Sequence, residues 1–267
     1  MTETDLTLCR SLLFLPASNP RAIAKARGLA ADMVVLDLED AVKAADKESA
    51  RVAAVEAVAE RFSGLSAIRI NSDERWRDLD IAAVAGSAVD YVIVPMTSGP
   101  EEVRRAAEGT GKPVLAMVET AAGVLNAGAI AAEAKGLVAG TNDLSASLGI
   151  PLGSHRPALV TALQTIVLAA RAAGIAAFDG VYNRLEDEAG LEAECREGRS
   201  FGFDGKSVIH PGQVEIANRL FSPGPEEVEK ARRLIEAAGG GAQRHEGEMI
   251  EDLHVRQARR LLAKARV

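Results

Sequence analysis

The chain has 267 residues, 48% of them apolar, which is enough for one large α/β domain with a sizeable core. The net charge is −7, from 31 basic and 38 acidic residues without a basic block, which argues against nucleic acid and anionic membranes as partners. The two cysteines form neither a CxxC pair nor a disulfide framework, and the first apolar run is too short for a signal peptide or membrane span, so we expect a cytoplasmic protein.

Short apolar runs that end in polar residues or proline recur along the chain and predict strands. After the first run, the pair Asn19-Pro20 places a capping residue before proline and predicts a helix to about Leu29. Further helical patterns cover 46–61, 157–173 and 186–196. The eight strand runs, each taken with the residues that end it, lie at 11–16, 33–40, 66–71, 91–95, 114–119, 136–143, 175–181 and 205–210.

Eight strands that alternate with helices predict a parallel sheet. Eight such units within this length match a closed (β/α)8 TIM barrel. An open, doubly wound sheet is the alternative, but it normally has a glycine-rich phosphate turn after its first strand, and residues 16–19 are not one. In a barrel the C-terminal strand ends meet on one face, where active sites form, and five charged residues fall there: Glu39, Asp40, Arg69, Glu119 and Asp143.

Two acidic residues stand at the ends of the fifth and sixth strands. Glu119 ends the fifth apolar run, and Asp143 stands just past the sixth. Without a cation, two such carboxylates would repel each other, whereas with Mg²⁺ they supply two hard oxygen ligands and leave positions for water and a chelating substrate. Either residue alone is more simply a helix cap or an ion-pair partner, but the repeated pattern predicts a Mg²⁺ site.

Arg69 interrupts an otherwise apolar strand, so its guanidinium must find a partner or face an anion. One interpretation is an internal salt bridge with Glu39 or Asp40. The other places Arg69 in the mouth of the barrel, where it binds a substrate carboxylate or steadies a developing enolate. We expect Glu39 and Asp40 to hold metal-bound water or to orient Arg69, although Asp40 could equally cap the next helix.

Several other enzyme classes lack their signatures. The four histidines form no HxxxH or HExxH pair, and no Gly-x-Ser-x-Gly elbow is present. We also find no lysine within the apolar part of an expected strand, so a Schiff-base aldolase is poorly supported. Stabilisation of a carbanion would then fall to the metal, which favours a metal-dependent carbon–carbon lyase.

The C-terminal part of the chain has a different pattern. Helices are expected at 223–238 and 252–263, with a flexible break at 239–241 between them. This predicts a barrel over 1–222 and a helical extension over 223–267 that belongs to the same domain. The extension is either a lid or an arm that reaches a neighbouring subunit, or else a linker followed by a packing helix.

Six motifs lie in a fixed order between residue 10 and about residue 213. They are Arg10-Ser-Leu-Leu-Phe-Leu-Pro, Val35-Leu-Asp-Leu-Glu-Asp-Ala-Val, Ile68-Arg-Ile-Asn, Met117-Val-Glu-Thr-Ala, Gly140-Thr-Asn-Asp-Leu and Gly205-Lys-Ser-Val-Ile-His-Pro-Gly-Gln. Together they resemble the citrate lyase β-subunit-like group of the HpcH/HpaI aldolase superfamily. Leu-Glu-Asp-Ala-Val and Gly-Lys-x-x-Ile-His-Pro are the most specific signals.

This resemblance implies a (β/α)8 barrel with Mg²⁺ held by Glu119 and Asp143 and with Arg69 as the active-site arginine. It also implies that Arg10 contacts substrate together with Arg69 and Glu119. Members form or cleave the bond between an acyl thioester and a 2-oxo acid, in citryl-, malyl- or citramalyl-thioesters. Several are trimers in which a C-terminal segment covers the neighbour's site, so we expect a homo-oligomer with a 2-oxo acid and an acyl-CoA thioester as partners.

Two positions depart from the family pattern. Relatives commonly have Pro-Lys where this chain has Pro95-Met96, so a cation that would meet phosphate is missing. The tail motif of relatives, Gly-x-Met-Ile-Asp, contains the acid that transfers the substrate proton. Here Gly247-Glu-Met-Ile-Glu251 is followed by Asp252, so either Glu251 or Asp252 is the expected proton carrier.

Three hypotheses follow. The chain is a Mg²⁺-dependent lyase or condensing enzyme for CoA thioesters, with a thioesterase on the same scaffold as a variant. Alternatively, it is the acyl-carrier-dependent β subunit of a citrate lyase, or a weakly catalytic protein that binds a 2-oxo acid. Turnover of free CoA thioesters would favour the first, companion carrier and transferase subunits the second, and oxo-acid binding without turnover the third.

Overall fold

The computed structural model describes residues 5–151, 156–239, 241, 243–245 and 248–265. The chain forms two compact units, Met1–Asn218 and Arg219–Val267, and each is described by itself. None of the described helices combines the length and the apolar character that crossing a membrane requires.

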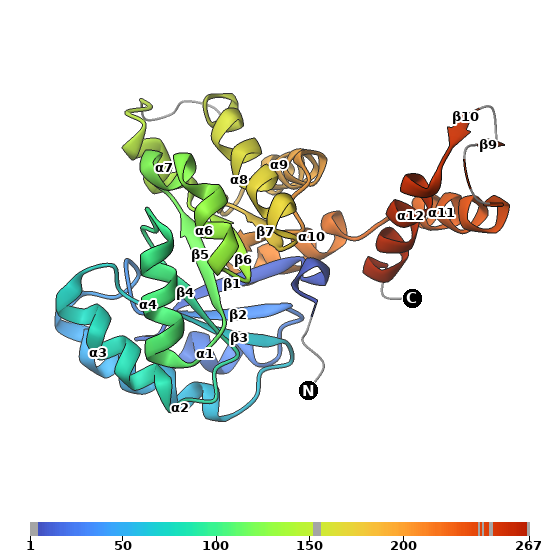
Figure 1. Ribbon diagram of the computed structural model, residues 1–267. Coiled ribbons are helices and arrows are strands. Elements are labelled where there is room, and N and C mark those ends of the chain that lie inside the picture. Colours follow the sequence, from blue (N-terminus) through green and yellow to red (C-terminus); the bar gives the residue numbers. More distant parts are fainter. Residues whose placement is uncertain (1–4, 152–155, 240, 242, 246–247, 266–267) are drawn as a thin grey trace. The chain divides into compact units, whose positions relative to one another are not determined.

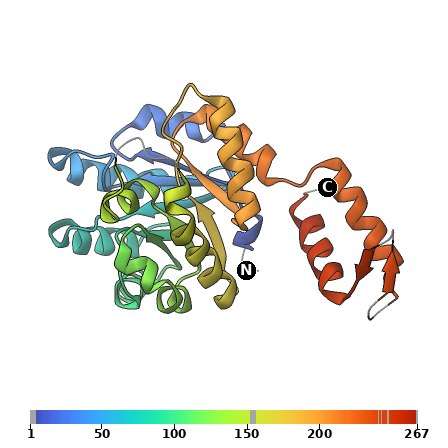
Figure 2. The same ribbon diagram turned by 90° about the horizontal axis from the view of Figure 1, so that it is seen from above.

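The first unit is a closed barrel of eight parallel strands in sequence order, in which β1 pairs with both β2 and β8. Helices surround the strands (Figures 1 and 2). The TIM barrel predicted from the sequence is therefore confirmed, and the open sheet is excluded. The strands are β1 (Ser11–Pro16), β2 (Met33–Asp37), β3 (Leu65–Arg69), β4 (Tyr91–Val94), β5 (Val114–Val118), β6 (Gly136–Ala139), β7 (Ala176–Asp179) and β8 (Gly205–Val208).

The strands form because their runs are apolar on both faces, as a sheet covered by helices requires. All five residues of β2 and of β5 are buried. Alternate residues then face the barrel interior, since the side-chain period of a strand is two residues. The interior core contains such i, i+2 pairs from several strands: Leu12 and Phe14, Met33 and Val35, Tyr91 and Ile93, Leu115 and Met117, Ala176 and Phe178.

The helices begin and end where local chemistry dictates. The Asn19 side chain accepts a hydrogen bond from the Ala22 N–H, and Pro20 occupies the first helical position, as the sequence predicted. The α9 helix extends to Phe201, beyond the expected end, and stops at Gly202 with φ of 101°. The helices are α1 (Pro20–Ala26), α2 (Lys47–Ala59), α3 (Glu74–Ala85), α4 (Pro100–Thr110), α5 (Ala121–Leu125), α6 (Ala127–Glu133), α7 (Thr141–Ser147), α8 (Val160–Ala173), α9 (Glu188–Phe201) and α10 (Pro211–Phe221), with 3-10 turns at Leu6–Leu8, Ala44–Asp46 and Arg156–Leu159.

The second unit pairs two helices with a short hairpin. Helices α11 (Pro225–Ala237) and α12 (Asp252–Lys264) pack against each other. An antiparallel pair, β9 (Gln243–His245) and β10 (Glu248–Ile250), lies between them in sequence and was not expected. Gly240 of the expected break and Gly247 of the tail motif lie outside the described residues. The covering role expected for this extension stays a prediction.

Candidate active site

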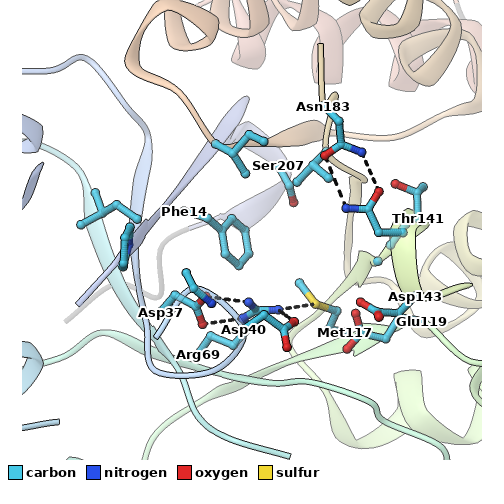
Figure 3. Close-up of a pocket in the computed structure, with 18 residues that line it drawn as sticks. Phe14, Asp37, Asp40, Arg69, Met117, Glu119, Thr141, Asp143, Asn183 and Ser207 are labelled. Atoms are coloured by element: carbon cyan, nitrogen blue, oxygen red, sulfur yellow. Dashed lines mark hydrogen bonds and ion pairs between the residues drawn. The ribbon is translucent and has the colours of Figure 1, made fainter. Parts of the chain in front are cut away.

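A cavity of about 390 Å³ opens among the residues at the C-terminal ends of the barrel strands. Its lining comes from the ends of β1, β2, β3, β5, β6, β7 and β8 or from the segments directly after them (Figure 3). The position agrees with the face on which TIM-barrel active sites form. Four of the charged residues predicted from the sequence line it: Asp40, Arg69, Glu119 and Asp143.

Arg69 is held by a carboxylate that the sequence analysis missed. Arg69 ends β3 and Asp37 ends β2, and the two are direct partners in the strand register. The guanidinium donates from Nε to Asp37 Oδ1 at 2.7 Å and from Nη2 to Oδ2 at 2.6 Å (Figure 3). Burial lowers the pKa of Arg69, but the hydrogen bonds and charge of Asp37 outweigh it and raise that pKa, so the guanidinium stays charged. Asp37 could have been found from its place inside the apolar run 33–38.

The remaining guanidinium nitrogen of Arg69 faces other groups of the site. Nη1 lies 3.2 Å from Glu39 Oε2, 3.5 Å from Asp40 Oδ2 and 3.8 Å from the sulfur of Met117. Glu39 is buried, and burial raises its pKa to about 7 against the lowering effect of Arg69. Asp40 is exposed and lines the cavity. The salt bridges considered from the sequence are therefore present, and Arg69 faces the cavity as well.

The segment that contains Glu39 and Asp40 is held from behind by a buried ammonium group. Lys47 Nζ donates to the carbonyl oxygens of Leu38 and Glu39 at 2.7 and 2.6 Å, and to Asn71 Oδ1 at 2.6 Å. Three neutral oxygens thus saturate its donors. This contact fixes the backbone from which both acids reach Arg69.

Glu119 is positioned by backbone segments on both sides. Its Oε1 accepts a hydrogen bond from the Met96 N–H at 2.6 Å, and Met96 adopts φ of 50°, a left-handed conformation that a non-glycine residue rarely takes. On the other side, a Cβ at Gly140 would collide with the Glu119 carboxylate. The carboxylate is therefore packed into a slot shaped for it.

Asp143 lies in the first turn of α7, exposed and beside Glu119 at the cavity wall (Figure 3). Burial raises the pKa of Glu119 to about 8, and the charges of Glu39 and Asp143 add to this effect while Met96 and Arg69 oppose it. The two carboxylates thus repel each other, as predicted for an acidic pair. Hard oxygen donors whose charges need neutralising fit Mg²⁺.

The protein's share of such a site is two carboxylates. Across the part of the chain that the structure describes, no group of three or more histidine, cysteine or acidic residues has the arrangement of a metal cage. A divalent ion here would take its other ligands from water and substrate, as Mg²⁺ commonly does.

Of the other predicted site residues, Arg10 lies away from the cavity, and two belong to the second unit. Arg10 stands just before β1, at the opposite end of the strands from the cavity, where Nε and Nη2 donate to Asp32 at 2.9 and 3.1 Å. The structure therefore separates it from Arg69 and Glu119. Glu251 and Asp252 belong to the second unit, where both are exposed at the start of α12 and the Glu251 N–H donates to His254 Nδ1 at 2.9 Å.

The expectation that no strand contains a lysine in its buried part was wrong. Lys206 lies in β8 with its side chain fully buried. Its Nζ contacts Gly180 O and Glu194 Oε1 at 2.6 Å and Asp179 Oδ2 at 3.3 Å. Next to it, Ser207 lines the cavity, and Lys206 does not. An ammonium group held by two carboxylates outside the cavity is not placed to act as a Schiff-base nucleophile. A Schiff-base aldolase therefore remains poorly supported, because of where Lys206 lies and not because such a lysine is lacking.

Two polar groups at the cavity mouth were not predicted from the sequence. Asn183, after β7, donates to Asn142 Oδ1 at 2.7 Å, and the Asn142 amide returns a longer contact of 3.4 Å (Figure 3). No motif pointed to this pair, because Asn142 in α7 and Asn183 after β7 are distant in sequence and are brought together by the pairing of β6 with β7.

The comparisons with known proteins agree with this geometry. The HpcH/HpaI aldolase/citrate lyase family matches residues 10–211. A (3S)-malyl-CoA thioesterase of Cereibacter sphaeroides is 45% identical over 96% of this chain and 94% of that protein. Citrate lyase subunit beta of Haemophilus influenzae is 33% identical over 98% of each.

Two solved structures are similar over most of the chain or nearly all of it. A CitE structure from Mycobacterium tuberculosis, in complex with magnesium, acetoacetate and coenzyme A, has a TM-score of 0.85 and 34% identity, and the match covers 98% of this chain and 100% of that one. A citrate lyase β subunit from the same organism, complexed with oxaloacetate and magnesium, has a TM-score of 0.74 and 34% identity, with 82% and 100% covered.

Proposed function

This chain belongs to the HpcH/HpaI aldolase/citrate lyase family, and on that premise we propose that it is a Mg²⁺-dependent hydrolase of a malyl-type CoA thioester. The observation that carries the proposal is the identity of 45% to a (3S)-malyl-CoA thioesterase over nearly the full length, against 33% to a citrate lyase β subunit. The paired carboxylates and the opposing arginine support it, because the substrate combines anionic oxygens with a polarisable carbonyl group.

In this proposal Glu119 and Asp143 would hold Mg²⁺, which would supply a Lewis acid beside the substrate. Arg69 binds the oxygen on which negative charge develops. Its two bonds to Asp37 keep the guanidinium in one orientation before substrate arrives. Such preorganisation of a charged donor is usually a large catalytic contribution.

Hydrolysis also needs a base for water. Asp40 supplies an exposed carboxylate at the cavity wall, 3.5 Å from Arg69 Nη1. Water adds to the thioester carbonyl carbon as Asp40 takes its proton. The carbon–sulfur bond then breaks, and the proton passes to the departing thiolate. The products are a dicarboxylic hydroxy acid and the free thiol of CoA. Buried Glu39 orients Arg69 in this scheme.

A second candidate is cleavage of the carbon–carbon bond of the same substrate. It is favoured by the 2-oxo acid oxaloacetate in one similar solved structure and by acetoacetate with coenzyme A in another. In that reaction Arg69 would stabilise the enolate of the shorter thioester, and Glu251 or Asp252 would return a proton to its carbon. The expected homotrimer, with its tail over a neighbouring cavity, belongs to this candidate.

One assay separates the two reactions. Purified protein is given malyl-CoA with and without Mg²⁺, and free thiol and 2-oxo acid are measured in parallel. Hydrolysis releases one thiol per substrate and no 2-oxo acid, whereas carbon–carbon cleavage releases glyoxylate and acetyl-CoA without free thiol. We expect Mg²⁺-dependent thiol release, and glyoxylate formation without thiol would overturn the hydrolase in favour of the lyase.

Two further measurements address the remaining alternatives. A citrate lyase β subunit that works on an acyl carrier would be inactive with free CoA thioesters and active with the acylated carrier. A protein that merely holds a 2-oxo acid would show saturable binding of pyruvate or oxaloacetate by calorimetry and no turnover of either form. Citryl- and citramalyl-CoA complete the substrate series.

A further inference from the structure

Ser207 of β8 presents a buried hydroxyl group for which the described part of the chain offers no hydrogen-bond partner. The residue is 1% exposed and lines the active-site cavity. Among the described residues, its Oγ has no hydrogen-bond partner. Figure 3 shows this oxygen directed toward the space between Phe14 and Thr141. A buried hydroxyl normally finds a partner, because burying it without one destabilises the folded state.

A serine on the neighbouring strand shows the ordinary solution. Ser11 of β1 is fully buried too, but its Oγ donates to Asn218 Oδ1 at 2.8 Å and accepts from the Asp32 N–H at 3.2 Å. The register explains the difference. Ser11 is opposite Lys206 on the face toward the helices, whereas Ser207 is opposite Leu12 on the face toward the barrel interior. On that inner face, the remaining source of a partner is whatever fills the cavity.

We propose that the Ser207 hydroxyl is a substrate-binding group that donates a hydrogen bond to an acceptor oxygen of the molecule in the cavity. This inference rests on the proposed function, in which that molecule contains carboxylate, hydroxyl and thioester carbonyl oxygens. The orphan donor is then satisfied in the complex. A molecule that lacks an oxygen at this point would leave the buried hydroxyl unpaired, so it should bind more weakly.

The proposal predicts opposite effects on stability and on binding for one substitution. Ser207→Ala removes a hydroxyl that has no partner among the described residues, so the melting temperature of the variant should equal or exceed that of the wild type. The same change removes a donor from the complex, so substrate affinity should fall by about tenfold, which corresponds to one hydrogen bond to a charged or strongly polar acceptor. A residue that merely supports the fold would lower both together.

Ser11→Ala is the matched control, because it removes a hydroxyl of the same size and burial that does have partners. It should lower the melting temperature and leave the KM for malyl-CoA unchanged. Ser207→Thr keeps the hydroxyl and should retain more of the affinity than Ser207→Ala, provided that circular dichroism shows the same fold.

Two binding arms identify the oxygen. With Mg²⁺ present, calorimetry with glyoxylate or pyruvate tests the carboxylate and keto oxygens, and calorimetry with acetyl-CoA tests the thioester carbonyl. A tenfold loss of affinity in either arm, without loss of stability, supports the proposal and names the oxygen. Unchanged affinity in both arms, or a loss of stability that accompanies weaker binding, overturns it. Failure of the wild type to turn over malyl-CoA bears on the proposed function instead, since the calorimetric arms need no turnover.

Discussion

The cavity has two groups of charged residues, one at the β2–β3 corner and one at the β5–β6 corner, and they differ in whether neighbouring charges neutralise each other. At the β2–β3 corner, Arg69 is surrounded by Asp37, Glu39 and Asp40, and every one of these contacts joins opposite charges. At the β5–β6 corner, Glu119 and Asp143 face each other as like charges, and Glu119 has a raised pKa.

The difference indicates which corner is complete in the protein alone. At the β2–β3 corner, a guanidinium paired by two hydrogen bonds is already neutralised and held in place by the protein. At the β5–β6 corner, two adjacent carboxylates, one of them buried, need a cation to neutralise their charge. Substitutions at the first corner should therefore damage geometry, whereas substitutions at the second should change ion binding.

The largest expected effect is on turnover, from a substitution at the β2–β3 corner. Arg69→Lys keeps the positive charge but loses the planar fork on Asp37. We expect malyl-CoA turnover to fall by about 10²–10³-fold, the usual loss when a preorganised donor to developing charge is removed. Steady-state kinetics with circular dichroism as the fold control test this. Near-normal rates would reduce Arg69 to a structural ion-pair partner.

Substitutions at the β5–β6 corner should weaken Mg²⁺ binding. Glu119→Gln and Asp143→Asn each replace an anionic oxygen with a neutral amide, and we expect Mg²⁺ affinity to drop by more than about 100-fold in calorimetry, beyond the loss typical of removing a supporting residue. In metal-free protein Glu119→Gln should also raise the melting temperature, because it removes a buried like charge and can keep the bond from Met96.

Retention of wild-type Mg²⁺ affinity in both variants would end the metal assignment. Asp73→Asn is a suitable control, because this exposed acid pairs with Arg75 outside the cavity lining.

Substitutions of Glu251 and Asp252 test whether the second unit takes part in the carbon–carbon reaction. General acid–base groups typically contribute 10²–10⁴-fold, so Glu251→Gln should lower glyoxylate release by about 100-fold if that residue returns the proton. Asp252→Asn is the matched partner, and the variant with the larger loss identifies the acid. Thiol release should change far less in both. Equal, small effects on both products would remove the tail from the chemistry.

The smallest expected effect concerns Lys47, which holds the backbone of the β2–β3 corner. Lys47→Met removes the ammonium group that joins the carbonyl oxygens of Leu38 and Glu39 to Asn71, so the acids beside Arg69 lose part of what fixes their position. We expect turnover to fall by about tenfold, since a displacement of about 1 Å can already cost up to 10²-fold, with Mg²⁺ affinity unchanged. Lys112→Met is the control, because its ammonium donates to the carbonyl oxygen of Ser87. Weaker Mg²⁺ binding in Lys47→Met would show that the corners are coupled.

The sequence by itself determined the barrel and the convergence of its principal charges. Eight apolar runs separated by helical patterns leave little choice of topology, and strands in parallel order bring their C-terminal ends to one face. Arg69, Glu119 and Asp143 could therefore be placed together before any coordinates were known, because each stands at or just past the end of an apolar run.

Tertiary structure decided what depends on strand parity, register and loop contacts. Whether Lys206 or Ser207 faces the cavity depends on which alternate residues of β8 turn inward, and a short run with mixed polarity does not show this. Arg69 takes its fork from Asp37 because β2 and β3 align these two residues. Closure of the barrel sets these relations among residues distant in sequence, and a local pattern of polarity contains no information about them.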